Sequence, residues 1–181
     1  MHTSSATFFF GLLILSFSTI ANAQSSARLL YELPSIFIEN IIVRPNGNLL
    51  LSTFDQGRVY TADPSNATSP LQVAVQIEGS TGLRGIAQVS PDVFVVSSGI
   101  FNPELWHFEP GTMRLSLLNF NSCGNSSSLS PSVQTVAEVP EAGALNGITP
   151  LPLKKHIVLG ADSTTGNIWR VDTSTGESTG Q

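Results

Sequence analysis

The chain has 181 residues, of which 41% are hydrophobic and 12% charged, and its formal net charge is −5. An acidic chain without a basic stripe argues against nucleic acid as a partner. Cys123 is the only cysteine, which excludes an internal disulfide, so the fold must be stabilised by packing.

The first 23 residues have the pattern of a secretory signal peptide. Phe8–Ile20 is apolar but short for a membrane span, and Ala21-Asn22-Ala23 precedes Gln24 as a cleavage pattern. We therefore predict an extracellular protein that begins near Gln24, spans residues 24–181 and has no further membrane segment. The alternative is an uncleaved anchor or a buried segment. Glycosylation acceptor triplets begin at Asn66 and Asn125 and suit a secretory route.

From Arg28 onward the sequence predicts short strands that are separated by Gly, Pro, Asn and Asp turns. The expected strands are, in order, Arg28–Leu33, Phe37–Arg44, Leu49–Phe54, Arg58–Ala62, Leu71–Ile77, Arg84–Val89, Val93–Ser97, Leu105–Phe108, Gln134–Val139, Gly147–Leu151, His156–Ala161 and Asn167–Val171. The segment 110–131 is predicted to be an irregular surface insertion. These strands lie too close together for crossover helices, so the fold class is all-β with antiparallel sheets.

Three segments share an aliphatic–aromatic–x–apolar–acidic pattern and were aligned as equivalent third strands: Arg58–Asp63, Glu104–Glu109 and Asn167–Asp172. A repeat of about 40–50 residues with four strands per unit is typical of propeller blades. We expect blades at about 36–78, 82–140 and 145–181, the last without its fourth strand. A sandwich or barrel is the alternative. Three blades would not close a ring, so the sequence is expected to be a fragment that lacks C-terminal blades.

Phe37–Ser52, Gly82–Val96 and Leu145–Gly176 resemble secreted fungal members of the gluconolactonase/regucalcin-like (senescence-marker-type) family. The resemblance implies a partial six-bladed β-propeller of the TolB-like or NHL-like kind. It also implies a divalent metal at the end of the central channel, and the oxygen-only ligand set suits calcium or magnesium, with calcium preferred. Glu39 and Asn146 fall on two of the ligand positions, and the third ligand is expected beyond the sequence.

Each of these residues also has a structural interpretation. Glu39 lies in an otherwise apolar strand and either lines the channel or points to solvent. Asn146 could be only a turn residue. Arg84 begins the corresponding strand of the second blade, where it would steer an anionic or carbonyl-bearing substrate, or it is a surface cation beside Glu78.

Three functions follow as hypotheses for a small-molecule substrate. The first is a metal-dependent lactone hydrolase, in which the fragment alone would be inactive. The second is a non-catalytic binding or scaffold propeller. The third, which comes from the resemblance alone, is a natural-product enzyme that promotes a pericyclic step in the channel. No Ser/His/Asp set suggests a serine hydrolase.

Overall fold

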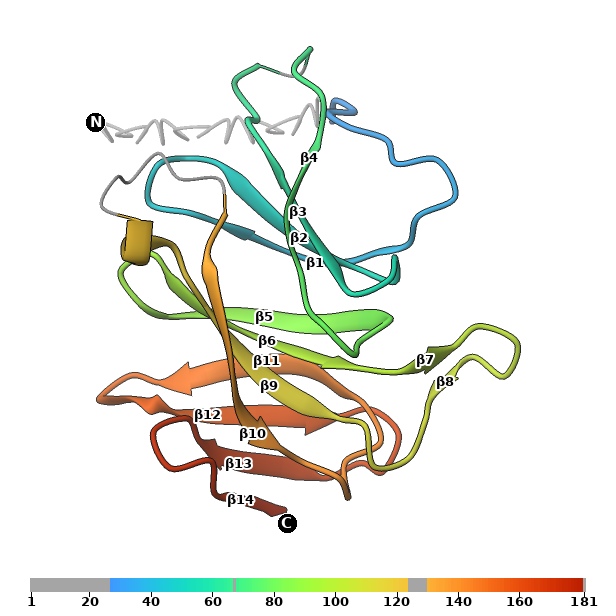
Figure 1. The fold of residues 1–181 in the computed structure, drawn as a ribbon, viewed down its shortest axis with the longest axis vertical. Helices are drawn as coiled ribbons and strands as arrows, with labels where there is room; N and C mark the ends of the chain where they lie inside the picture. Colours follow the sequence, from blue (N-terminus) through green and yellow to red (C-terminus); the bar gives the residue numbers. More distant parts are fainter. Residues whose placement is uncertain (1–26, 67, 124–129, 181) are drawn as a thin grey trace, which may run out of the picture.

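The computed structural model describes residues 27–66, 68–123 and 130–180, and these form three consecutive four-stranded antiparallel sheets, layered one on the next (Figure 1). The first sheet contains β1 (Ile38–Val43), β2 (Leu49–Thr53), β3 (Arg58–Ala62) and β4 (Gln72–Gln76). The second contains β5 (Gly82–Ser90), β6 (Val93–Gly99), β9 (Arg114–Asn119) and β10 (Ser132–Glu138). The third contains β11 (Leu145–Leu151), β12 (Lys154–Asp162), β13 (Ile168–Asp172) and β14 (Ser178–Gly180). These sheets are three propeller blades. The expected signal peptide and Asn125 lie outside the described residues.

A short hairpin, β7 (Phe101–Asn102) and β8 (His107–Phe108), is inserted between β6 and β9 and projects from the second blade (Figure 1). The one helical element of the described residues is a 3₁₀ turn, η1 (Phe120–Cys123). No helix in the described part is long and apolar enough to cross a membrane.

Alternating apolar residues are buried between neighbouring blades. Leu50 and Val59 of the first blade pack with Phe94 and Leu118 of the second. A second cluster joins the second and third blades through residues that include Val95, Leu115, Val158, Trp169 and Val171. Each cluster is the inward face of two sheets, as the period of two in a strand requires.

An ion pair also joins the first two blades. Arg44, which follows β1, contacts Asp92 in the β5–β6 turn through Nε to Oδ1 at 2.9 Å and Nη2 to Oδ2 at 2.7 Å. The Arg44 side chain is fully buried, and its guanidinium lies 3.7 Å from the centre of the Phe120 ring. Asp92 has a φ of +53°, a region that suits Asp and Asn better than most residues.

Four details of the predicted strand order are wrong. Arg28–Leu33 forms no strand; instead, Tyr31 and Leu33 pack against the outer face of the first blade. Glu104–Glu109 belongs to the β7–β8 hairpin, and the third strand of the second blade is β9, inside the segment predicted to be irregular. The third blade has its fourth strand, β14.

The outermost faces of the first and third blades expose apolar side chains. If the sequence ends after three blades, Trp169 and Ile157 are expected on such an open face, but both are buried, and Ile41, Val43 and Ile168 are more than half exposed instead. Trp169 is buried because of the register of its strand. It pairs with Gly160 in a row that faces the second blade, and its neighbour Ile168 points outward.

Candidate functional site

Three polar side chains meet where the first strand of each blade begins. Glu39 comes from β1, Arg84 from β5 and Asn146 from β11. With the amide orientation that satisfies its hydrogen bonds, Asn146 Nδ2 donates to Glu39 Oε1 over 2.7 Å, and Asn146 Oδ1 accepts from Arg84 Nη1 over 3.2 Å. Arg84 Nη1 lies 3.6 Å from Glu39 Oε1. The structure therefore brings all three candidate residues together, and Arg84 pairs with Glu39, not with Glu78.

Each of the three residues lies at an irregularity in its strand. The pairing of β1 with β2 skips Glu39, the pairing of β11 with β12 skips Asn146, and the pairing of β5 with β6 shifts between Leu83 and Ile86. A β-bulge adds a residue outside the ladder and redirects its side chain, and bulges are frequent beside active sites. The bulges account for the convergence of the three side chains.

A sequence signal for these bulges exists. Ile38-Glu-Asn-Ile41, Leu83-Arg-Gly-Ile86 and Leu145-Asn-Gly-Ile148 share an aliphatic residue, a polar residue, a small or polar residue and isoleucine. Glycine is required in the second of these motifs, because a Cβ on Gly85 would collide with the backbone oxygen of Asn146. The sequence repeat described above concerns the third strand of each blade and does not include this pattern in the first strands.

Arg84 is held from several sides. Its guanidinium lies 5.4 Å from the centre of the Phe54 ring and 5.2 Å from that of Phe108. Its backbone oxygen accepts a hydrogen bond of 2.5 Å from the buried Ser52 hydroxyl of the first blade. The side chain is 15% exposed, so part of this positioned cation remains accessible.

An aromatic cluster adjoins Arg84 and was not anticipated. It consists of Phe37, Phe54, Phe101, Trp106 and Phe108, and it gathers the start of the first blade, the end of β2 and the β7–β8 hairpin. All of its members except Phe108 line a pocket of about 390 Å³. The third-strand pattern of Glu104–Glu109 would place Trp106 between blades, but Trp106 lies in the hairpin and is 60% exposed.

The donor atoms of Glu39, Arg84 and Asn146 decide whether this site can hold a cation. Glu39 and Asn146 offer a carboxylate and an amide oxygen, the donors that calcium prefers. The Arg84 guanidinium contacts both side chains and would compete with a divalent ion for them. Among the described residues, no group of three His, Cys, Asp or Glu side chains is arranged to hold a metal. Glu39 and Asn146 alone therefore do not fit a calcium site while Arg84 is in place, and calcium binding stays a prediction.

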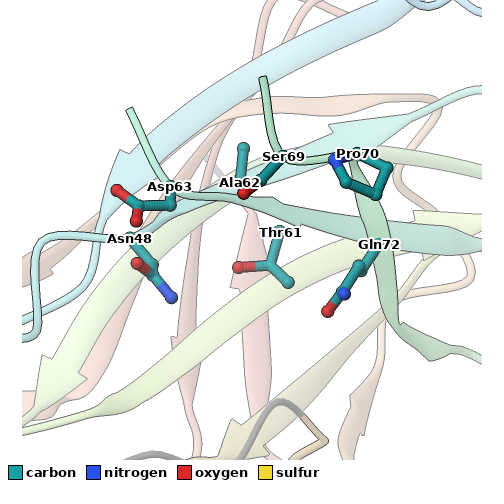
Figure 2. Close-up of a pocket in the computed structure, with 7 residues that line it drawn as sticks. All are labelled: Asn48, Thr61, Ala62, Asp63, Ser69, Pro70 and Gln72. Carbon is teal, nitrogen blue, oxygen red and sulfur yellow. The ribbon is translucent and has the colours of Figure 1, made fainter. Parts of the chain in front are cut away.

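A second, smaller pocket of about 150 Å³ lies in the first blade and is lined by Asn48, Thr61, Ala62, Asp63, Ser69, Pro70 and Gln72 (Figure 2). The side chains of Asn48, Thr61 and Gln72 extend to the same side of β3 in this view. Its volume is below that of typical ligand sites, and it contains none of the three converging residues.

Asp162, the last residue of β12, has a structural role. Burial alone would raise the pKa of its carboxyl group. Hydrogen bonds from Gly143, Thr164, Thr165 and Ala144 lower that pKa to about 2. Trp169 Nε1 also donates to Asp162 Oδ2 over 3.3 Å. The ionised carboxylate fixes the β12–β13 turn against the chain segment that leads into β11.

Comparisons with known proteins agree with this architecture, although no family model matches the sequence. A protein of Sarocladium schorii described as "Putative hetero-Diels-Alderase asR5" is 31% identical over 83% of this chain and 41% of its own length. A "Putative hetero-Diels-Alderase" of a Phoma species is 29% identical over 83% of this chain and 47% of its own length. The chain thus spans less than half the length of both curated relatives.

The crystal structure of a gluconolactonase from Xanthomonas campestris superposes with a TM-score of 0.51 at 16% identity, over 78% of this chain and 45% of that protein. At this identity the match concerns the fold alone. It agrees with the three layered four-stranded sheets, whose pairing order and inter-blade cores were described above. The chain is a β-propeller protein.

Proposed function

We propose that the propeller to which these blades belong is an enzyme that binds a conjugated carbonyl compound at the channel mouth and promotes a hetero-Diels–Alder cycloaddition. The observation that carries the proposal is the position of Arg84. Its guanidinium is fixed between Glu39, Asn146 and the rings of Phe54 and Phe108, and Phe54 also lines the aromatic pocket.

This arrangement suits the chemistry of such a reaction. A hetero-Diels–Alder cycloaddition joins a four-atom diene that contains a heteroatom to a two-atom alkene, and it needs no nucleophile, leaving group or net proton transfer. An enzyme can accelerate it by holding the partners in a reactive orientation and by stabilising charge at the heteroatom. The aromatic walls would provide the first effect, and an N–H of Arg84, donated to the carbonyl oxygen, would provide the second.

Glu39 and Asn146 act on Arg84 in this proposal. Glu39 neutralises the guanidinium in a site that is only partly solvated, and Asn146 fixes its rotation. The two curated relatives, whose descriptions name the same reaction, support the assignment.

The test is a reaction of methyl 2-oxo-4-phenylbut-3-enoate with ethyl vinyl ether in the presence of the purified protein. The product dihydropyran is analysed by chiral chromatography, because only reaction within the protein yields an excess of one enantiomer. We expect enantiomeric enrichment with the protein and a racemate without it. The loss of one positioned donor in Arg84→Met should lower the catalysed rate by about tenfold to a hundredfold.

The matched control is Arg170→Met, which removes an exposed arginine of β13 in the third blade. Its rate and selectivity should equal those of the unchanged protein. A racemic product at the uncatalysed rate would contradict the proposal. Calcium-dependent hydrolysis of glucono-δ-lactone under the same conditions would favour the lactonase hypothesis instead.

Secretion and glycosylation belong to the proposal as well. The only acceptor among the described residues, Asn66, is exposed in the loop before β4. Expression in a fungal host should give a secreted protein that begins near Gln24 and loses mass on treatment with an N-glycosidase. Retention in cells with an intact N-terminus would contradict this part.

A further inference from the structure

The aromatic pocket has features of a binding site in its own right. Its volume of about 390 Å³ lies within the range of small-molecule sites. It is lined by Ser35, Phe37, Phe54, Gln56, Thr81, Phe101, Pro103 and Trp106. Four of these eight residues are aromatic, the others are a proline and three neutral polar residues, and no carboxylate takes part.

The rings are arranged to accept another flat ring. Phe54 stacks on Phe37 with centroids 5.3 Å apart and on Phe101 with centroids 4.4 Å apart. Trp106 stands nearly perpendicular to both outer members of this row, at 83° to Phe37 and 81° to Phe101. These rings already contact one another, so a planar ring in the pocket would pack on the surfaces that they leave open, which are largest at Trp106 and Phe37.

Trp106 is held at the rim at some cost. It is 60% exposed and has a φ of +55°, which is unfavourable for a bulky residue. The hairpin that carries it is anchored locally. Thr81 Oγ1 accepts from Phe101 N over 2.7 Å, and Asn102 Oδ1 accepts from the backbone nitrogens of Glu104 and Leu105. The side chain is thus presented on a defined loop before any ligand arrives.

Charge selects among flat ligands. The Arg84 guanidinium lies beside Phe54, and no acidic residue lines the pocket to compensate a ligand cation. We propose that this pocket binds a planar, uncharged aromatic ring, with the ring against Trp106 and Phe37. The inference rests on the proposed function only in taking the bound ring to be part of the substrate.

Binding can be measured without any reaction. The chain has two tryptophans, so the ¹⁵N-labelled protein gives two indole N–H signals, one from the exposed Trp106 and one from the buried Trp169. Acetophenone is compared with acetylcyclohexane, its saturated counterpart. We expect acetophenone to shift the Trp106 signal saturably, to leave that of Trp169 unchanged, and to bind about fivefold or more tightly than acetylcyclohexane.

Variants locate the contact. Trp106→Ala should weaken acetophenone binding by about tenfold, as measured by saturation transfer to the ligand. Leu105→Ala removes the neighbouring exposed side chain, which does not line the pocket, and should leave affinity unchanged. An unshifted Trp169 signal confirms that each variant is folded.

Three results would overturn the inference: equal affinity for the two ketones, an unchanged affinity in Trp106→Ala, or tighter binding of phenyltrimethylammonium than of acetophenone. The outcome is separable from that of the proposed function. Selective acetophenone binding without enantiomeric enrichment would support this inference and contradict the proposed cycloaddition. Enantiomeric enrichment without selective acetophenone binding would support the cycloaddition and contradict this inference.

Discussion

Replacing Asp92 with asparagine tests how strongly the Arg44–Asp92 pair holds the first two blades together. Removing one member of a buried ion pair costs about 3–5 kcal/mol, because the remaining charge stays buried. Asparagine keeps one hydrogen-bond acceptor, which is worth about 1 kcal/mol, and it tolerates the positive φ of this position. The expected loss in the free energy of unfolding is therefore about 2–4 kcal/mol, a large part of the about 5–15 kcal/mol of a typical domain.

Urea unfolding followed by Trp169 fluorescence measures this loss, with the midpoint expected to fall by about 1–2 M. Asp55→Asn is the matched control, because it breaks the partly exposed pair with Arg58 and should cost less than about 1 kcal/mol. The cost of Asp92→Asn should also persist in 1 M NaCl, where exposed pairs are screened. A loss below about 1 kcal/mol, or one that salt removes, would refute the reasoning that burial makes this pair essential.

The other predictions concern Asp162, Ser52 and the cation site. The folded pKa of Asp162, about 2, lies below the ordinary 3.8, so its carboxylate stabilises the fold above pH 3.8, and this stability is lost as the pH falls towards 2. In Asp162→Asn, the free energy of unfolding should therefore lose the part of its pH dependence between pH 3.8 and 2 that this group supplies, about 2 kcal/mol. Ser52→Ala leaves the Arg84 backbone oxygen without its buried donor and should cost about 1–3 kcal/mol in urea unfolding, whereas an effect below about 0.5 kcal/mol would show that water replaces the hydroxyl. In calorimetric titrations, Arg84→Met should raise calcium affinity by about tenfold or more, because it removes a competing cation, and Glu39→Gln should abolish it; calcium affinity that neither variant changes would place the ion elsewhere.

The blades were predictable because apolar alternation and turn residues specify antiparallel strands locally. β1, β2, β3 and β10 lie close to their expected limits. The second blade was harder. Two aromatic residues in Leu105–Phe108 imitate the third-strand pattern, although Trp106 adopts a left-handed conformation that no strand contains. A pattern of side chains does not reveal a positive φ at a residue other than glycine.

The candidate residues Glu39, Arg84 and Asn146 were found from the sequence, but their relation was not. Glu78 was considered as a partner of Arg84 because it is close in sequence. Its partner Glu39 lies in another blade. The aromatic pocket could not be predicted, since Phe37, Phe54 and Trp106 come from three separate segments of the chain that are brought together only by the packing of the first two blades.

The bulges at Glu39, Arg84 and Asn146 separate the chemistry of this protein from its stability. A residue that lies outside the ladder can be exchanged without disturbing the pairing or the cores between blades. The three blades carry a carboxylate, a guanidinium and an amide at the same place outside the ladder, and these side chains are coupled to one another through one ion pair and two hydrogen bonds. In a propeller built in this way, the side chains at the bulges can change together while the strand pairing and the cores between blades stay the same.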